Sequence, residues 1–380
     1  MVYFLRDKVL TLTRIDDERH MRRALELALE GWGRVAPNPM VGAVVVREGE
    51  VVGEGYHAEW GGPHAEVVAL EAAAAKAEGA TLYVTLEPCH HTGKTGPCSR
   101  AIAESGIRRV VCGTGEVSPP ADGGGGWLRS QGTQVDVGVC ELEARDLIAV
   151  HLHSSSGSER PFVAVKYAMS IDARLSQLPG ESTEVTSGEA IAEAHRLRAG
   201  HDAVMVGIDT VVADDPRLTV REWKAPRVPP LRVVLDSNLR TPLDSMLVRS
   251  AADMPVCVFT AEGRDTGRAK ELETRGVEVS RVAALSASGG LDLGPVLARL
   301  RERGVRSVLC EGGGTLGSAL LAARCVDRLY TFIAPRLFGD PGVPGFRLER
   351  GQAERDWRLV ERKPLGPVTL LVLSPESAAA

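Results

Sequence analysis

The feature that most constrains this chain is a histidine and two cysteines carried by three short motifs. The motifs are Pro63-His64-Ala65-Glu66, Thr85-Leu86-Glu87-Pro88-Cys89 and Pro97-Cys98. Structural zinc sites usually close four protein ligands, whereas catalytic zinc sites use three and leave a position for water. The fold is therefore expected to bring His64, Cys89 and Cys98 together around one Zn²⁺. The alternative, a surface histidine and two ordinary core cysteines, does not explain why the three motifs occur together.

Glu66 follows the histidine by two residues and is placed to move protons without binding the metal. Zinc lowers the pKa of a bound water, so that hydroxide is available near neutral pH. In the zinc deaminases this hydroxide attacks an amino-bearing ring carbon, and a glutamate serves as general acid and base. The pattern therefore predicts an enzyme that removes an amino group from a heterocycle by hydrolysis.

The residues around these motifs predict elements that present the ligands. Apolar positions from Ala65 to Ala77 indicate a helix that ends at Gly79, residues 80–86 indicate a buried strand, and Cys98 opens another helix. His64 and Cys98 then lie at helix N-termini, where the partial positive charge favours thiolate over thiol.

Composition limits the class of protein. The 380 residues indicate two domains, and the 44% apolar content is enough for packed cores. No stretch approaches the roughly 20 apolar residues of a membrane span, and Met1–Arg14 lacks the features of a signal peptide. Seven scattered cysteines fit a reducing cytoplasm better than a disulfide framework. The net charge of −5 gives no basic footprint for nucleic acid. We expect a cytoplasmic enzyme with a small substrate and neither a nucleic-acid nor a membrane partner.

Residues 1–153 are predicted to form the first domain. A helix is expected over Asp17–Glu30, and strands Val41–Val46 and Val51–Tyr56 are expected to form a hairpin. With further strands at Arg109–Cys112 and Gln134–Val139, the order indicates an α/β/α domain with a mixed sheet. The polar stretch 154–160 is the linker candidate.

Residues 161–380 are predicted to form a second α/β domain. A helix is expected over Ser187–Arg198, with Thr186 and Glu189 in capping-box spacing and Gly200 at its end. The expected strands are Phe162–Ala168, Ala203–Val206, Leu231–Leu235, Val256–Phe259, Val305–Leu309, Leu329–Ile333 and Val368–Leu373.

Two features of this second half leave a functional and a structural interpretation open. The turn Gly312-Gly313-Gly314 between a strand and a helix suits either an anion cradle or plain packing. Its spacing is not G-x-G-x-x-G, so no Rossmann fingerprint is inferred. The segment from Thr210 to Arg221, with Asp214-Asp215-Pro216, is either a binding segment or a solvated polar loop.

Further motifs follow one another in both halves. In the first half they are Asn38-Pro39-Met40-Val41-Gly42, Gly55-Tyr56-His57 and the stretch 93–98, besides the three metal motifs. In the second half they are Lys166, Ser170-Ile171-Asp172, Gly180-Glu181-Ser182, residues 210–216, Leu218-Thr219-Val220-Arg221, Asp236-Ser237, Glu311-Gly312-Gly313 and Ile333-Ala334-Pro335. Over roughly residues 17–375 the chain resembles the bifunctional deaminase/reductase family of riboflavin biosynthesis. Eight residues separate Cys89 from Cys98, whereas nucleic-acid-editing deaminases usually have two.

The resemblance implies an α/β fold in both halves: an N-terminal cytidine-deaminase-like α/β/α domain and then a dihydrofolate-reductase-like α/β domain. The first half would use one Zn²⁺ to hydrolyse the 2-amino group of 2,5-diamino-6-(5-phosphoribosylamino)pyrimidin-4(3H)-one. The second half would use NADPH to reduce the ribosyl side chain to ribityl. A homo-oligomer is expected.

The resemblance also implies the roles of residues. Glu66 is the catalytic acid and base, and His64, Cys89 and Cys98 are the metal ligands. The substrate-binding positions are Asn38, His57, His91, Lys94, Ser182, Arg198, Leu218, Arg221 and Glu311. The cofactor-binding positions are Ala168, Glu184, Thr210, Asp214, Ser237, Gly313, Gly314, Thr315, Leu316 and Gly317. Two arginines suit a ribose phosphate because guanidinium binds phosphate oxygens bidentately. For His57, His91 and His90, an ordinary polar histidine remains an alternative.

Several positions depart from the family pattern. Residues 116–120 and the glycines 123–126 replace a common motif, so a loop of different shape or mobility is expected there. Gly96 stands where proline is usual, and Ala173 replaces a common glycine. Glu184 stands where an aromatic residue commonly packs on the cofactor, so weaker cofactor binding is expected.

Three other hypotheses remain at this level. One is a deaminase with a degenerate reductase half. Another is a non-catalytic, zinc-stabilised module that binds a pyrimidine for regulation, against which the intact Glu66 argues. A third is an RNA-acting deaminase, which the cysteine spacing and the acidic balance disfavour.

Overall fold

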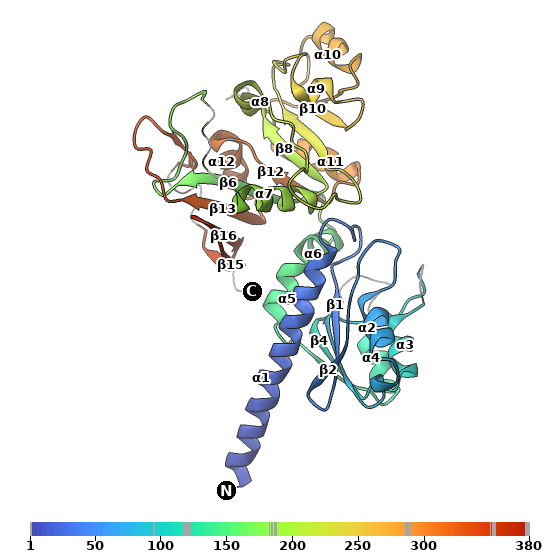
Figure 1. Cartoon of the computed structure of the whole chain (residues 1–380). Coiled ribbons are helices and arrows are strands. Elements are labelled where there is room, and N and C mark those ends of the chain that lie inside the picture. The colour runs from blue at the N-terminus through green and yellow to red at the C-terminus, as the bar shows by residue number, and fades with distance from the viewer. Residues whose placement is uncertain are drawn as a thin grey trace. The chain divides into compact units, whose positions relative to one another are not determined.

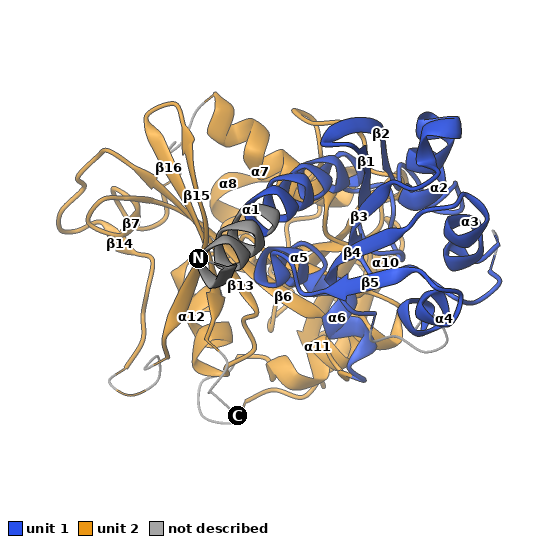
Figure 2. Ribbon diagram, turned by 90° about the horizontal axis from the view of Figure 1, so that it is seen from below, with its two compact units in different colours: residues 1–157 blue, residues 158–380 orange. Residues whose placement is uncertain are grey.

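Two large β-sheets organise the chain, one in each of two units that span residues 1–157 and 158–380 (Figure 2). The computed structural model describes residues 2–93, 96–116, 123–181, 183, 185, 188–285, 290–349, 351 and 355–376, with side chains from residue 14 onward. The two units divide inside the stretch 154–160, of which Ser154 and Ser155 belong to helix α6 (Ala149–Ser155). Within the described residues, no helix is both long enough and apolar enough to cross a membrane.

The sheet of the first unit is mixed, as predicted. Its strand order is β2-β1-β3-β4-β5. The strands are β1 (Gly42–Arg47), β2 (Glu50–Tyr56), β3 (Thr81–Leu86), β4 (Arg109–Thr114) and β5 (Gln134–Val137). β1 is antiparallel to β2 and β3, whereas β3, β4 and β5 are parallel. The predicted hairpin is confirmed, and it turns through Glu48 and Gly49 with positive φ angles of 54° and 84°.

Helices cover both faces of this sheet (Figure 1). They are α1 (Val2–Ala28), the 3₁₀ turn η1 (Leu29–Gly31), α2 (Ala65–Ala73), the 3₁₀ turn η2 (Ala74–Ala77), α3 (Cys98–Glu104), α4 (Gly124–Ser130), α5 (Glu141–Leu147) and α6. Met21 and Ala24 of α1 pack on Val44 and Val111, while α2, α3 and α4 pack on the opposite face. The expected α/β/α arrangement is therefore confirmed.

Two expectations for this unit were wrong. Helix α1 begins at Val2 rather than at Asp17, because no glycine or proline interrupts the preceding residues. The glycines expected to form a loop instead open a helix, since α4 begins at Gly124.

A buried ionic network ties α1 to the sheet. The Arg109 guanidinium donates to both carboxylate oxygens of Asp17 at 2.8 Å and to Asp136 at 2.7 Å. The Tyr83 hydroxyl donates to the same Asp17 carboxylate at 2.7 Å. Asp17 is only 6% exposed, so the two donors of Arg109 and the one of Tyr83 replace water around a buried charge.

The second unit is built on a nine-stranded sheet with the order β11-β10-β9-β8-β12-β6-β13-β16-β15. Its strands are β6 (Phe162–Ser170), β8 (Ala203–Gly207), β9 (Leu231–Leu235), β10 (Val256–Ala261), β11 (Glu278–Val282), β12 (Ser307–Cys310), β13 (Arg328–Ala334), β15 (Trp357–Leu365) and β16 (Val368–Pro375). The strands from β11 to β13 are parallel, and β16 and β15 continue antiparallel. All seven predicted strands are present. β11, β15 and the ribbon of β7 (Arg174–Ser176) with β14 (Val343–Pro344) were missed.

Helices flank this second sheet. They are α7 (Glu189–Ala199), α8 (Ile208–Asp214), α9 (Met246–Arg249), α10 (Thr266–Glu273), α11 (Leu293–Glu302) and α12 (Gly314–Ala322). One core lies under α11 and α12, and another lies under α8, α9 and α10. Helix α7 starts two residues later than predicted, with Gly188 as its N-cap, and its last residue is Ala199, one residue later than predicted, with Gly200 as the C-cap as expected. The expected capping residue Thr186 lies outside the described residues.

Candidate functional site

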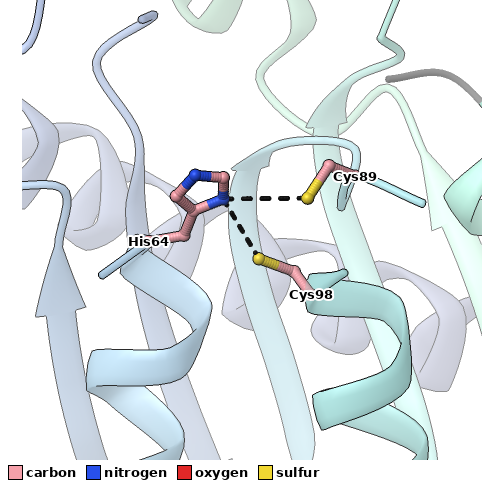
Figure 3. A group of neighbouring side chains, drawn as sticks. All are labelled: His64, Cys89 and Cys98. Atoms are coloured by element: carbon pink, nitrogen blue, oxygen red, sulfur yellow. Dashed lines mark hydrogen bonds between the residues drawn. The ribbon is translucent and has the colours of Figure 1, made fainter. Parts of the chain in front are cut away.

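His64, Cys89 and Cys98 come together at the carboxyl end of β3 (Figure 3). His64 is the N-cap of α2, Cys98 is the first residue of α3, and Cys89 lies in the loop after β3. His64 Nδ1 is 3.2 Å from Cys98 Sγ and 3.7 Å from Cys89 Sγ, and all three ligand atoms lie within 4.8 Å of one another. In a tetrahedral zinc site such atoms are about 3.5–3.8 Å apart.

This donor set fits Zn²⁺. Two sulfurs and one imidazole nitrogen are typical zinc ligands, and the described residues contribute no fourth metal-binding side chain to the group. The pKa of Cys89 is lowered to about 4, chiefly by a hydrogen bond from Cys98 and also by His64.

Glu66 lies in the first turn of α2, next to these ligands. Its side chain is 4% exposed, and burial raises the pKa of its carboxyl. A buried carboxyl beside a three-ligand set is the arrangement that general acid and base catalysis requires.

A hydrogen-bond chain orients Asn38. His57 Nδ1 lies 2.9 Å from the carbonyl oxygen of Pro63, which only accepts, so Nδ1 carries the proton. His57 Nε2 lies 3.1 Å from Asn38 Nδ2, an amide nitrogen that only donates, so Nε2 is the acceptor. The Asn38 carbonyl oxygen is thereby turned away from His57 and keeps its lone pairs for another partner.

The loop that carries Cys89 is held by backbone groups. Gly125 N and Glu116 N donate to the two carboxylate oxygens of Glu87 at 2.7 and 3.3 Å. A Cβ on Gly124 would lie 1.8 Å from the carbonyl oxygen of Pro88. The glycines of α4 thus let the helix approach this loop. This role of the glycines was not predicted from the sequence, although the acid inside the Glu87-Pro88-Cys89 motif was a signal for it.

The other predicted residues near this site differ in their surroundings. His90 Nδ1 lies 2.8 Å from Ser99 Oγ, and its ring stacks on Trp127 with centroids 4.9 Å apart, as for an ordinary polar histidine. His91 Nδ1 is buried and has no hydrogen-bond partner among the described residues. Lys94 lies outside them.

In the second unit, a buried carboxylate organises the predicted substrate positions. Glu311 follows β12 and accepts from Arg198 of α7 at 2.5 and 3.0 Å, while Lys166 Nζ of β6 lies 3.8 Å away. Burial by itself raises the pKa of Glu311, but the positive charges of Arg198 and Lys166 outweigh it and lower the pKa to about 2. Burial lowers the pKa of Lys166. Lys166 is one of the family motif positions, but no role was predicted for it from the sequence.

The loop from Leu218 to Arg221 lies against α7. Arg198 Nη1 donates to the carbonyl oxygen of Thr219 at 3.0 Å. Arg221 is exposed, and its guanidinium donates only to Thr219 Oγ1 among the described residues. Its pKa is lowered by burial and by the positive charges of Arg198 and Arg217. Ser182 lies outside the described residues.

The predicted cofactor positions gather at one edge of the second sheet. They lie in or after four neighbouring parallel strands, β9, β8, β12 and β6. Ser237 follows β9, Thr210 and Asp214 lie in the helix after β8, Ala168 lies near the end of β6, and Gly313, Gly314, Thr315, Leu316 and Gly317 follow β12. In parallel sheets, ligands bind at the carboxyl ends of the strands. Glu184 lies outside the described residues.

The glycine turn before α12 has features of both a packing turn and a ligand-binding turn. A Cβ on Gly314 would lie 2.4 Å from the carbonyl oxygen of Pro344, and one on Gly317 would lie 2.0 Å from the Tyr167 hydroxyl. These two glycines serve packing. A Cβ on Gly313 would meet nothing within 4 Å, so the backbone there is open to a ligand.

Comparison with known proteins gives matches across both units. A family model described as the RibD C-terminal domain matches residues 161–371, and one described as the cytidine and deoxycytidylate deaminase zinc-binding region matches residues 14–114. The riboflavin biosynthesis protein RibD of Aquifex aeolicus is 43% identical over 325 residues, covering 85% of this chain and 88% of that protein. RibD of Escherichia coli is 36% identical, covering 94% and 99% of the two chains.

Solved structures agree with these matches. Acinetobacter baumannii RibD has a TM-score of 0.76 at 34% identity and covers 96% of this chain and 100% of its own. A diaminohydroxyphosphoribosylaminopyrimidine deaminase/5-amino-6-(5-phosphoribosylamino)uracil reductase from Thermotoga maritima has a TM-score of 0.78 at 35% identity, covering 96% and 99%. The predicted pair of folds is therefore confirmed.

Proposed function

Because this chain belongs to the RibD family of riboflavin biosynthesis proteins, we propose that its two units act in succession on one phosphorylated pyrimidine. The chain is a bifunctional enzyme, with a zinc-binding deaminase half and a reductase half that uses NADPH. The first unit removes the 2-amino group of 2,5-diamino-6-(5-phosphoribosylamino)pyrimidin-4(3H)-one, and the second reduces the ribosyl side chain of the product to ribityl. The relatives match across both halves, so nothing favours a degenerate reductase or a non-catalytic module.

The three-ligand group with a buried carboxyl beside it carries the deaminase assignment. His64, Cys89 and Cys98 hold the metal, which when bound lowers the pKa of water to supply hydroxide near neutral pH. Glu66 would accept one proton from the attacking water and pass it to a ring nitrogen, and would then move the proton of the newly formed hydroxyl group to the departing amine. Asn38 presents its carbonyl oxygen to an N–H group of the pyrimidine, in the orientation that His57 imposes.

In the reductase half, the charges support a phosphate site. Arg198 and Lys166 both face Glu311, which leaves the exposed guanidinium of Arg221 for the ribose phosphate. Glu311 is held rigidly enough to orient the sugar. Ala168, Thr210, Asp214 and Ser237, together with the glycine turn, would hold NADPH, which would supply the hydride when bound. We also propose that Ser182, His91, Leu218 and Lys94 contact the substrate, as the family positions imply.

A coupled assay tests this proposal. Zinc-loaded protein and the diamino substrate should release one equivalent of ammonia, and NADPH should then be oxidised in equal amount. Ammonia release without NADPH oxidation would indicate a deaminase alone, and neither activity would indicate a binding module. We also propose a cytoplasmic location, a homo-oligomeric state and no nucleic-acid partner. Analytical sedimentation would test the homo-oligomeric state.

A further inference from the structure

One buried histidine of the second unit contacts the loop that bears Arg221. His195 lies on α7, is 3% exposed, and matches none of the positions assigned above. Its Nδ1 atom lies 3.0 Å from the backbone nitrogen of Arg221. A backbone N–H only donates, so Nδ1 is the acceptor and the neutral ring carries its proton on Nε2.

The loop that bears Arg221 has no regular secondary structure. No strand or helix forms among the residues between α8 and β9, all of which the structure describes. Leu218 is buried at a φ of 52°, a left-handed conformation that a residue with a Cβ rarely adopts. Such a conformation persists only where the surroundings enforce it.

Two side chains of α7 enforce the conformation of this loop. His195 and Arg198 are three residues apart and therefore share one face of the helix. Arg198 fixes the carbonyl oxygen of Thr219, and His195 fixes the N–H of Arg221. Arg198 also holds Glu311, whereas the contact of His195 serves the loop alone.

We propose that His195 is a positioning residue of the reductase, which accepts the backbone N–H of Arg221 and so holds the Arg221 guanidinium where the substrate phosphate binds. This inference rests on the proposed phosphate contact of Arg221. His195 touches neither substrate nor cofactor and acts through Arg221.

The charges around His195 keep its acceptor available. Burial, followed by the positive charges of Arg198 and Arg221, lowers the pKa of His195 to about 4, and the charge of Glu311 and a hydrogen bond to the backbone of Thr219 oppose this only in part. The ring is therefore neutral near pH 7. If Nδ1 were protonated, two donors would face each other and the hydrogen bond from the N–H of Arg221 would be lost.

Substitutions of His195 separate positioning from simple structural loss. His195→Leu removes the acceptor and should raise the reductase KM for the phosphorylated intermediate about tenfold, since the half-buried N–H of Arg221 loses its partner. The reductase kcat and the dissociation constant of NADPH should stay within about twofold. His195→Asn places Oδ1 where Nδ1 lies and should restore a KM close to that of the wild type. An unchanged KM in His195→Leu, an equal defect in His195→Asn, or a loss of NADPH affinity would each overturn the proposal.

A double substitution links the effect to Arg221. Arg221→Ala should raise the same KM, and adding His195→Leu should then have little further effect. Full additivity of the two effects would overturn the proposal. If Arg221→Ala leaves KM unchanged, the proposed phosphate contact itself is wrong. If Arg221→Ala raises KM and His195→Leu does not, only the role of His195 is wrong.

A second buried histidine gives a matched control. His201 is 5% exposed, and its Nδ1 lies 2.7 Å from the carbonyl oxygen of Leu197, away from the loop backbone. His201→Asn should lower thermal stability and leave KM unchanged. A rise in KM equal to that of His195→Leu would show that any disturbance near α7 has this effect, and would overturn the proposal.

Discussion

Replacing Gly124 by alanine tests whether the glycines of α4 hold the loop of Cys89 in place. The backbone of Gly124 does not require positive φ, so the added methyl group is the only perturbation. Its Cβ would lie 1.8 Å from the carbonyl oxygen of Pro88, and that oxygen must move by about 1.2 Å to reach a 3.0 Å contact. Zinc ligands tolerate displacements of only about 0.2 Å. We therefore expect zinc affinity to fall by about 10- to 100-fold, as for other groups that orient metal ligands.

Gly126 provides the matched control for this substitution. A Cβ there would meet nothing within 4 Å, and alanine is favoured over glycine in a helix by about 1 kcal/mol. Gly126→Ala should therefore keep zinc and raise the melting temperature, whereas Gly124→Ala should lose about 1–3 kcal/mol of stability through overpacking. Chelator competition measures zinc affinity, and thermal unfolding measures stability. Wild-type zinc affinity in Gly124→Ala would refute the reasoning.

Three further substitutions probe the two sites and the backbone. Glu66→Gln should keep zinc and lower deaminase kcat by about 10²- to 10⁴-fold without affecting reduction of supplied intermediate; near-wild-type deamination would remove its proton-transfer role. Ala173→Gly should raise the free energy of unfolding of the second unit by about 0.5–1 kcal/mol in urea, because Ala173 has a φ of 57°, and no gain would contradict the strain. The pKa of Glu311 is lowered to about 2, so its contribution to the free energy of unfolding is fully present above about pH 5 and is lost as the pH falls toward 2. Glu311→Gln should flatten the plot of unfolding free energy against pH between about pH 2 and pH 5. An unaltered plot would show that another group titrates there.

The sequence predicted the elements whose signals are local. The hairpin of β1 and β2 follows from alternating apolar residues around a glycine turn, and the metal ligands follow from short motifs with a known chemistry. Strand β15 was missed because its central residues Glu361, Arg362 and Lys363 are charged. An edge strand exposed to water tolerates such residues, and its pairing with β16 supplies the order that its own composition does not indicate.

Contacts between distant backbone groups were not predictable in the same way. Four consecutive glycines usually indicate a mobile loop, yet here they open α4, because the helix must pass within contact distance of Pro88 and Glu87. The reason for the glycines lies in residues about 36 positions earlier in the chain. No pattern within the glycine stretch itself distinguishes a flexible linker from a closely packed helix start.

The charged cluster of the reductase half depends on strand order in a similar way. Lys166, Arg198 and Glu311 come from β6, from α7 and from the end of β12, and each element was predicted nearly in place. What brings them together is the insertion of β12 between β8 and β6, although β12 follows both in the chain. Since neighbouring parallel strands end at the same edge of the sheet, this insertion places Glu311 between two cations. Local periodicity carries no information on that order, so the buried ion cluster could be inferred only from the family motifs or from the fold itself.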